Sequence, residues 1–227
     1  MVLIQKVNIS FLKNSFEHEA WSNDRLVCGI DEVGRGCLAG PVVSAAVIIP
    51  AHKKMPLLKD SKLLTPQERE KAYKWIKKYC WIGVSVVSHR VINCQNIRNA
   101  TLISMKKALL NLLMISPFRP SAVLVDAMPL SLVDTNYDDI PVYFFEKGES
   151  KSTSIAAASI VAKVTRDALM KKFDDCFPGY GFSKHKGYGT SVHRSALLKN
   201  GSLVVHRTLF IRSVLYKDAY EKQLSLC

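Results

Sequence analysis

The sequence contains no apolar stretch long enough to cross a membrane. Its longest apolar stretches, such as Pro41–Pro50, fall well short of the roughly 20 residues that a transmembrane helix requires. The N-terminal segment also lacks a continuous apolar run followed by a small-residue cleavage site, so we expect no signal peptide. Both absences predict a cytoplasmic protein with no membrane partner.

The cysteines lack the close, patterned spacing of a disulfide framework or a zinc site. There are 6 of them and no C-x-x-C pair. Several lie in apolar, strand-like runs, where a thiol packs as a small hydrophobic group. We therefore expect reduced thiols in a cytosolic protein, at Cys28, Cys37, Cys80, Cys94, Cys176 and Cys227.

Negative charge is scarce. The chain has 32 basic and 19 acidic residues, a net charge of +13, and residues 151–227 alone carry 13 basic and 5 acidic residues, a net +8. A basic surface favours a polyanionic partner, because binding releases the counterions of its phosphates. The same excess could equally serve solubility alone, so composition by itself does not decide between the two.

Repeats, low-complexity tracts and convincing linkers are also missing, which predicts a single domain over residues 1–227. After an initial pair of strands, strand-like and helical segments alternate, a pattern typical of an α/β fold with a mixed sheet and helices on its faces. The predicted strands are Val27–Val33, Pro41–Pro50, Trp81–Ser88, Ala122–Asp126 and Pro141–Glu146, and the predicted helices are Thr65–Tyr79, Asn96–Met114 and Ser154–Phe173.

Acidic residues follow several of the apolar segments. Asp31 and Glu32 end one predicted strand, Asp126 ends another, and Glu149 comes shortly before the helix that begins near Ser154. Carboxylates crowded together repel each other unless a cation neutralises them, and Mg²⁺ or Mn²⁺ would do so through oxygen ligands. Hydrolysis of a phosphodiester by two ions roughly 3.5–4 Å apart requires a shared carboxylate, for which Asp31 is the candidate.

Regular strand geometry sets a condition on this site. Adjacent residues of a strand point to opposite faces, so Asp31 and Glu32 reach one ion only if the strand ends or distorts there, which Gly34 would permit. Alternatively, Glu32 contributes its backbone carbonyl. Acids at strand ends are also common as turn formers and caps, and we expect that role for Asp60, Asp134, Asp138 and Asp139.

The glycine-rich segment Gly34–Gly40 contains the pattern G-x-G-x-x-A directly after a predicted strand. This pattern is the fingerprint of dinucleotide binding, but it requires a helix to begin within the motif, and here Pro41 and a β-branched run follow. The competing interpretations are a plain tight turn and a loop that closes on a sugar–phosphate, with exposed N–H groups and Arg35 as a phosphate contact. The neighbouring acids favour the second.

Taken together, these segments resemble the ribonuclease HII family. The family pattern D-E-V-G-R-G-P-L-A-G-P-V-V is matched at every position but one by Asp31–Val43. The resemblance extends over roughly Leu26 to Arg207. Its further motifs are the D-S-K-x-L of residues 60–64, the V-D of Val125-Asp126, the K-G-D of Lys147–Glu149, the long helix Ser154–Asp167 and the G-Y-G-T of Gly187–Thr190.

The resemblance implies a ribonuclease H-like mixed β-sheet flanked by helices, with a core over about 26–180 and a small helical C-terminal extension over about 181–227 that contacts substrate. It implies an endonuclease, expected as a monomer, that uses Mg²⁺ or Mn²⁺ to hydrolyse the RNA strand of RNA/DNA hybrids. Such enzymes also incise at ribonucleotides embedded in duplex DNA, and they leave 5′-phosphate and 3′-hydroxyl ends.

Site residues also follow from the resemblance. The catalytic, metal-holding set would be Asp31, Glu32, Asp126 and Glu149. The loop residues Gly34, Arg35 and Gly36 would read the ribose 2′-hydroxyl, the group that distinguishes RNA from DNA, and Tyr188 would pack against the neighbouring sugar.

Polar residues on and near the last long helix are weaker candidates. Lys163 and Arg166 are predicted phosphate contacts, and Asp167 is predicted to be structural. Ser150, Ser152 and Ser154 would either anchor phosphate at the positive N-terminus of that helix or simply cap it. His185 and His193 are expected to face solvent or contact phosphate.

The chain departs from the family pattern at four places. Cys37 replaces a proline in the glycine loop and should loosen it slightly, Ala127 replaces a glycine, and Glu149 stands where aspartate is commoner. The sequence HRTLF after residue 205 replaces H-R-R-S-F. The sister family, ribonuclease HIII, carries a substrate-binding domain before its first acids, and the short segment before Asp31 favours HII.

Two other functions are open on sequence alone. A non-catalytic module that binds duplexes would account for the basic C-terminal third, and a dinucleotide-dependent enzyme would account for the glycine pattern. The first predicts salt-sensitive binding without cleavage. The second requires a helix that starts at Gly36.

Overall fold

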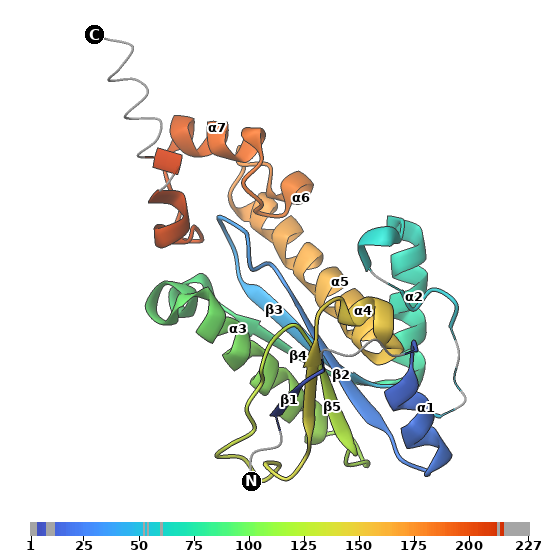
Figure 1. Cartoon of the computed structure of the whole chain (residues 1–227). Helices are drawn as coiled ribbons and strands as arrows, with labels where there is room; N and C mark the ends of the chain where they lie inside the picture. The colour runs from blue at the N-terminus through green and yellow to red at the C-terminus, as the bar shows by residue number, and fades with distance from the viewer. Residues whose placement is uncertain are drawn as a thin grey trace.

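A six-stranded mixed sheet forms the centre of the molecule (Figure 1), in the computed structural model of residues 4–7, 12–51, 53, 55–59, 61–212 and 214–215. Asp60, Cys227 and the end of the predicted C-terminal segment lie outside these described residues. The strands are β1 (Ile4–Lys6), β2 (Val27–Val33), β3 (Val42–Ile48), β4 (Trp81–Val87), β5 (Ala122–Asp126) and β6 (Val142–Phe145).

Helical segments within the described residues accompany the sheet. They are α1 (Ser15–Ser22), the 3₁₀ turn η1 (Ser61–Leu63), α2 (Pro66–Tyr79), α3 (His89–Leu113), α4 (Gly148–Lys151), α5 (Thr153–Cys176), α6 (Phe182–His185) and α7 (Ser191–Asn200). The predicted α/β class with a mixed sheet is confirmed. The sequence patterns did not identify β1 or α1.

The sheet has the strand order β1-β6-β5-β2-β3-β4. Strands β1, β6, β5 and β2 run parallel, and β3 and β4 are antiparallel to their neighbours. Strand β2 pairs with β5 only as far as Ile30, but with β3 as far as Val33. The last residues of β2 therefore extend beyond the end of β5, and Asp31 and Glu32 lie on this extension. The strand has the predicted bounds Val27–Val33 and continues through both acids rather than ending at them.

Helices cover both faces of the sheet (Figure 1). One hydrophobic cluster joins β2, β3 and β5 to α3 through residues such as Ile30, Ala46 and Leu109. A second joins β3 to α2 and α5 through residues such as Val47, Ile76 and Ile160. All seven residues of β3 are buried, as expected for a strand covered on both sides.

Helix termini follow the sequence signals in part. The predicted capping box at Thr65 is present: its hydroxyl accepts from the Glu68 N–H at 3.2 Å, and the Glu68 carboxylate accepts from the Thr65 N–H at 2.8 Å. Helix α3 begins at His89 rather than Asn96, but Asn96 has φ 64° and ψ 167° and forms a kink. Its side chain caps the second part by accepting from the Asn99 N–H at 3.0 Å.

Helix α1 helps to cap the N-terminus of α5. The Ser152 hydroxyl accepts from the Ile155 N–H at 3.2 Å and donates to the buried Glu17 carboxylate at 2.5 Å. Glu17 also accepts from the Ser154 N–H at 3.1 Å, and Ser152 and Ser154 are buried. Ser152 therefore caps the helix, as one of the two predicted roles required, whereas Ser154 contributes its backbone N–H and its hydroxyl caps nothing. Phosphate binding at this helix end is excluded because the Glu17 carboxylate already occupies it.

Helices α6 and α7 pack against the far end of α5 (Figure 1). Phe182 and Tyr180 stack with ring centroids 5.6 Å apart and contact Met170 of α5 in one cluster. The glycine loop after β2 joins this assembly, because its Ala39 belongs to the same cluster. No described helix combines the length and the apolar character of a membrane span.

Gly29 sets the closeness of α5 to β2. A Cβ atom built on Gly29 would lie 2.1 Å from the backbone carbon of Ser154 and 2.3 Å from the Ile155 nitrogen. Neither backbone atom can move without displacing the helix start. This approach also explains the small residues in the first turns of α5, which lie against the sheet.

We expect Gly29→Ala to lower the free energy of unfolding by roughly 3 kcal/mol or more, since overpacking against rigid backbone forces α5 away from the sheet. Gly36→Ala is the matched control, because a Cβ on Gly36 meets no atom within 4 Å. Urea unfolding of both variants and the wild type measures the effect. Equal stability of the two variants would contradict this packing.

Candidate active site

The predicted acids line one cavity of about 250 Å³ at the end of β5. Asp31 and Glu32 come from the extension of β2, Asp126 from the last position of β5, and Glu149 from α4. A hydrogen bond of 2.7 Å from the Gly148 N–H to the Asp126 carboxylate fixes α4 against the end of β5. The ends of two strands, β2 and β5, and the short helix α4 thus bring the four carboxylates together.

Burial and mutual repulsion act on these acids. Burial, then the charges of Glu32 and Asp126, raise the pKa of Asp31 well above its usual range, against the opposing effect of the Ser159 hydroxyl. The pKa of Glu32 is raised to about 7, mainly by burial; the charge of Asp126 contributes to this rise, and the Arg35 guanidinium opposes it. Charged carboxylates are therefore costly in this cavity unless a cation accompanies them.

The donor set fits divalent ions that prefer oxygen. Glu32 and Glu149 each have one buried carboxylate oxygen, Oε2, without a hydrogen-bond partner. Such oxygens are expected where an additional electropositive group binds. Among the described residues, no three acidic, histidine or cysteine side chains form a ready-made metal cluster. The acids share the cavity without closing around a single point.

Serine and lysine side chains complete the cavity, and sequence reasoning missed most of them. Ser61 and Ser159 line it and form a hydrogen bond of 2.9 Å with each other. Lys62 lies 3.9 Å from Glu149. Ser159 could have been identified from the sequence, because it places a hydroxyl group within an otherwise apolar part of α5.

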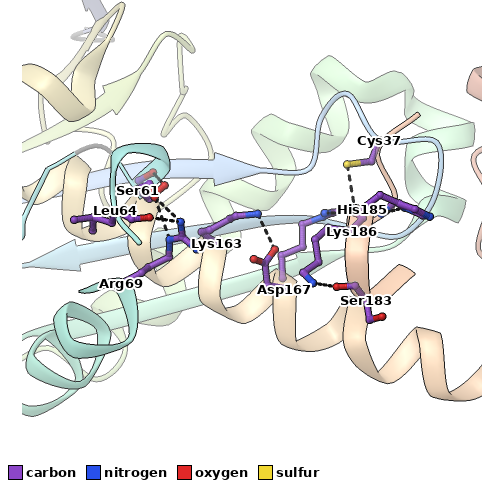
Figure 2. Close-up of polar contacts among 12 residues, drawn as sticks. Cys37, Ser61, Leu64, Arg69, Lys163, Asp167, Ser183, His185 and Lys186 are labelled. Atoms are coloured by element: carbon purple, nitrogen blue, oxygen red, sulfur yellow. Dashed lines mark hydrogen bonds and ion pairs between the residues drawn. The ribbon is translucent and has the colours of Figure 1, made fainter. Parts of the chain in front are cut away.

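Lys163 also lines the cavity, as a phosphate contact would require. Its ammonium group forms an ion pair of 2.8 Å with Asp167, one turn along α5 (Figure 2). Asp167 thus holds Lys163 in place, in agreement with the structural role predicted for it. The phosphate contact of Lys163 stays a prediction.

The glycine loop lies beside the acids. The Arg35 guanidinium is 3.4 Å from Glu32, and its side chain is 41% exposed, so it can reach a bound molecule. Residues 34–41 contain no helix and lead directly into β3. A dinucleotide-binding turn, which needs a helix from Gly36, is therefore excluded.

The phosphate contact predicted for Arg166 is wrong. This side chain is completely buried, and its guanidinium donates to the carbonyls of Ala39, Pro41 and Lys186 at 3.2, 2.9 and 2.8 Å. The sequence showed a basic residue three positions after Lys163 on the same helix, but it did not show the loop that covers this residue. Gly34 packs directly on this guanidinium, because a Cβ there would lie 2.2 Å from Arg166 Nε.

Tyr188 lines the same cavity as the acids and is 40% exposed. It forms an antiparallel bridge with Cys37 of the glycine loop, and the Leu38 N–H donates to the Gly187 carbonyl at 2.8 Å. The Cys37 thiol is buried and directed at the Lys186 carbonyl, 3.8 Å away (Figure 2). The glycine loop and residues 186–190, here called the tyrosine segment, therefore form one connected surface.

A buried histidine cluster supports the tyrosine segment. His193 is fully buried, stacks on His185 with centroids 4.3 Å apart, and places Nε2 3.1 Å from Nε2 of His206. Solvent exposure and phosphate contact, which were predicted for His193, are wrong because α6 and α7 enclose it. His185 accepts from the Gly187 N–H at 3.1 Å, and His193 bonds the Tyr188 carbonyl at 2.9 Å.

Each histidine of the cluster has a defined tautomer. Carbonyls can only accept, so His193 carries its proton on Nδ1 toward Tyr188 and presents Nε2 as an acceptor. His206 accepts from the Leu203 N–H at 2.8 Å through Nδ1, so its Nε2 donates to His193. Neither His193 nor His206 can therefore take up a second ring proton without losing one of these hydrogen bonds. Burial, and then the neighbouring His193, lower the pKa of His206 to about 4.

The comparisons with known proteins agree with this geometry. The family model described as Ribonuclease HII matches residues 28–213. The chain belongs to the ribonuclease HII family. It is similar to the ribonuclease HII of Alkaliphilus metalliredigens, with 43% identity over 88% of this chain and 97% of the relative. The Geobacter sulfurreducens ribonuclease HII is 46% identical over 82% of each chain.

Solved structures show the same fold. The ribonuclease HII in a PCNA complex from Archaeoglobus fulgidus aligns with a TM-score of 0.67 and 27% identity, covering 81% of this chain and 94% of that one. Bst-RNase HIII in complex with Mn²⁺ aligns with a TM-score of 0.72 and 20% identity, over 92% and 76% of the two chains, and supports the fold alone. The predicted family and ribonuclease H-like fold are confirmed. The chain is thus a ribonuclease H, a hydrolase of a family that acts on RNA/DNA substrates and needs divalent metals.

We expect Asp31→Asn to be more stable than the wild type in EDTA, by about 1 kcal/mol, because it removes a buried charge that two other acids repel. Added Mg²⁺ should raise the melting temperature of the wild type more than that of the variant. Thermal unfolding with and without the ion tests this, with the exposed Asp138→Asn as control. A variant less stable in EDTA, with an unchanged response to Mg²⁺, would argue against repulsion at this site.

The histidine cluster predicts acid sensitivity. A folded-state pKa near 4 against an ordinary value of 6.5 means that the unfolded chain binds more protons between these pH values. Stability contributed by neutral His206 is therefore complete above pH 6.5 and is lost as the pH falls toward 4. His206→Asn keeps an acceptor for Leu203 and should show a flatter melting temperature over this range. His18→Asn, at an exposed position, should keep the wild-type slope, and a wild-type slope in His206→Asn would refute the assignment.

Proposed function

We propose that this ribonuclease H is an endonuclease that cuts the RNA strand of RNA/DNA hybrids and incises duplex DNA at single embedded ribonucleotides, leaving 5′-phosphate and 3′-hydroxyl ends. The observation that supports this most is the shared cavity of Asp31, Glu32, Asp126 and Glu149 directly beside a loop with an exposed arginine. Family membership supplies the nuclease chemistry, and the cavity supplies a place for it.

The acids would hold two Mg²⁺ or Mn²⁺ ions. When bound, such a pair activates the attacking water and stabilises the departing 3′ oxygen. Asp31 is the candidate for the shared ligand, since the charges of both Glu32 and Asp126 act on it. Glu149 would take the place of the commoner aspartate, and its partnerless Oε2 is available for that role. Asp126 and Glu149 are kept in register by the Gly148 hydrogen bond.

Substrate recognition would use the glycine loop, which lies beside Glu32, and the cavity residues Tyr188 and Lys163. The backbone of Gly34, Arg35 and Gly36 would bind the ribose 2′-hydroxyl, and the exposed ring of Tyr188 would pack against the adjacent sugar. Lys163 would contact a phosphate. The segment from residue 181 onward, which carries Tyr188, would then contribute to binding, in a protein of the cytoplasm that acts as a monomer.

A purely duplex-binding role is the weaker alternative. Four acids gathered in one cavity weaken attraction to a polyanion unless metal ions accompany them, so a module evolved only for binding has no use for them. Binding without cleavage in the presence of either ion is the result that would favour this alternative.

We expect Asp126→Asn to reduce nicking by roughly a hundredfold to a thousandfold or more, because metal ligands contribute several kcal/mol of transition-state charge stabilisation. Binding of the duplex should change little. The measurement is nicking of a labelled duplex with one ribonucleotide, and of a full RNA/DNA hybrid, in Mg²⁺, Mn²⁺ or EDTA.

Asp138→Asn is the matched control, since this acid is exposed and lies outside the cavity. It should nick at the wild-type rate. Full activity of Asp126→Asn, or wild-type nicking in excess EDTA, would overturn the metal-dependent assignment. If the wild type cleaves the hybrid but not the duplex with one ribonucleotide, only the proposed incision at single ribonucleotides is wrong.

A further inference from the structure

Two arginines, Arg166 and Arg207, are completely buried beside the glycine loop. Within the described residues, neither forms an ion pair with a carboxylate. They are also close to each other, because the charge of Arg166 contributes to lowering the pKa of Arg207 to about 10, after the larger effect of burial. Burying two like charges without acidic partners is costly, so a compensating role is expected.

Backbone carbonyls take up these charges. Arg207 donates to the carbonyls of Gly34 at 2.6 Å, Arg35 at 2.7 Å and Gly40 at 3.0 Å. Arg166 donates to Ala39 and Pro41 at the other end of the loop and to Lys186 in the tyrosine segment. Between them, the two guanidiniums hold both ends of the loop from one side.

This bonding fixes which way the loop peptides face. In a trans peptide the carbonyl and the N–H point in opposite directions. The Gly34 carbonyl points inward to Arg207, so the N–H of Arg35 points outward, and the inward Arg35 carbonyl likewise turns the Gly36 N–H outward. The space beyond Gly36 is open, because a Cβ there meets no atom within 4 Å. Two consecutive N–H groups therefore point away from the buried guanidiniums, and the space at Gly36 can admit a bound molecule.

We propose that Arg166 and Arg207 are positioning residues for substrate recognition: they hold the loop so that the N–H groups of Arg35 and Gly36 bind an oxygen of the substrate sugar. The inference rests on the proposed function. The two buried cations also polarise these donors, because their charges are little screened in the interior. Recognition of ribose would then depend on side chains that never touch the substrate.

The first test compares Arg207→Lys and Arg166→Lys with the wild type. Lysine keeps the charge but lacks the planar fork that serves three carbonyls at once. The matched control is Arg69→Lys, because Arg69 also holds carbonyls, those of Ser61 and Leu64, but does not touch the glycine loop (Figure 2). Melting temperatures identify the variants that fold.

The readout is sugar discrimination, expressed as the Ki of an all-DNA duplex divided by the KM of the same duplex with one ribonucleotide. We expect this ratio to fall by about tenfold in Arg207→Lys and Arg166→Lys, with a smaller change in kcat, and to be unchanged in Arg69→Lys. A folded Arg207→Lys protein with the wild-type ratio would overturn the inference, as would an equal loss in Arg69→Lys.

A second test uses the wild-type protein and does not depend on any variant folding. The amide resonances of Arg35 and Gly36 should shift on binding the ribonucleotide-containing duplex and shift much less on binding the all-DNA duplex. Equal shifts with both duplexes would mean that the loop binds a phosphate oxygen and would overturn the assignment to the sugar, and no shift with either would overturn the contact itself.

The two failures are distinguishable. If the wild type cuts no ribonucleotide-containing duplex, the proposed function fails and this inference fails with it. If the wild type cuts and discriminates, but discrimination survives the loss of either arginine fork, only the positioning role is wrong.

Discussion

The close contact of α5 with β2 is the constraint on which the site depends. Gly29 lies against Ser154 at one end of this contact, and Gly34 lies against Arg166 at the other. Twelve residues of helix rise by about 18 Å and five residues of strand by about 17 Å, so the two elements remain matched along this whole length. Ser159 therefore meets Asp31, and Lys163 meets the cavity, from a helix that is aligned by its first turn.

Much of the fold was predictable because its elements carry strong local signals. The apolar strands, the capping box at Thr65 and the long apolar helix were each visible in the sequence, and each is present. Strand β1 and helix α1 were not, since three residues of strand and one short helix carry little periodicity. The start of α3 was misjudged because Asn96 has the properties of a helix cap and indeed acts as one, inside a longer helical segment.

The grouping of the acids was predictable, but the surroundings of the basic residues were not. Strand ends bring Asp31 and Asp126 to one edge whatever their side-chain contacts are. By contrast, Arg166 lies only three residues beyond Lys163 on the same helix, yet one is buried and the other lines the cavity. Which of them stays accessible depends on how residues 34–41 fold over α5, and no local pattern encodes that. The same holds for His193, whose burial follows from the packing of α6 and α7.

The capping of α5 by α1 depends on residues that precede the family match. Glu17 and Asn14, whose side chains accept the Ser154 and Thr153 N–H groups, both lie before residue 28, where the family match begins. A fragment cut to the matched residues would keep every acid of the cavity. It would nevertheless expose the first turn of the helix that aligns them. The sequence match therefore begins inside the folded unit that supports the site, not at its edge.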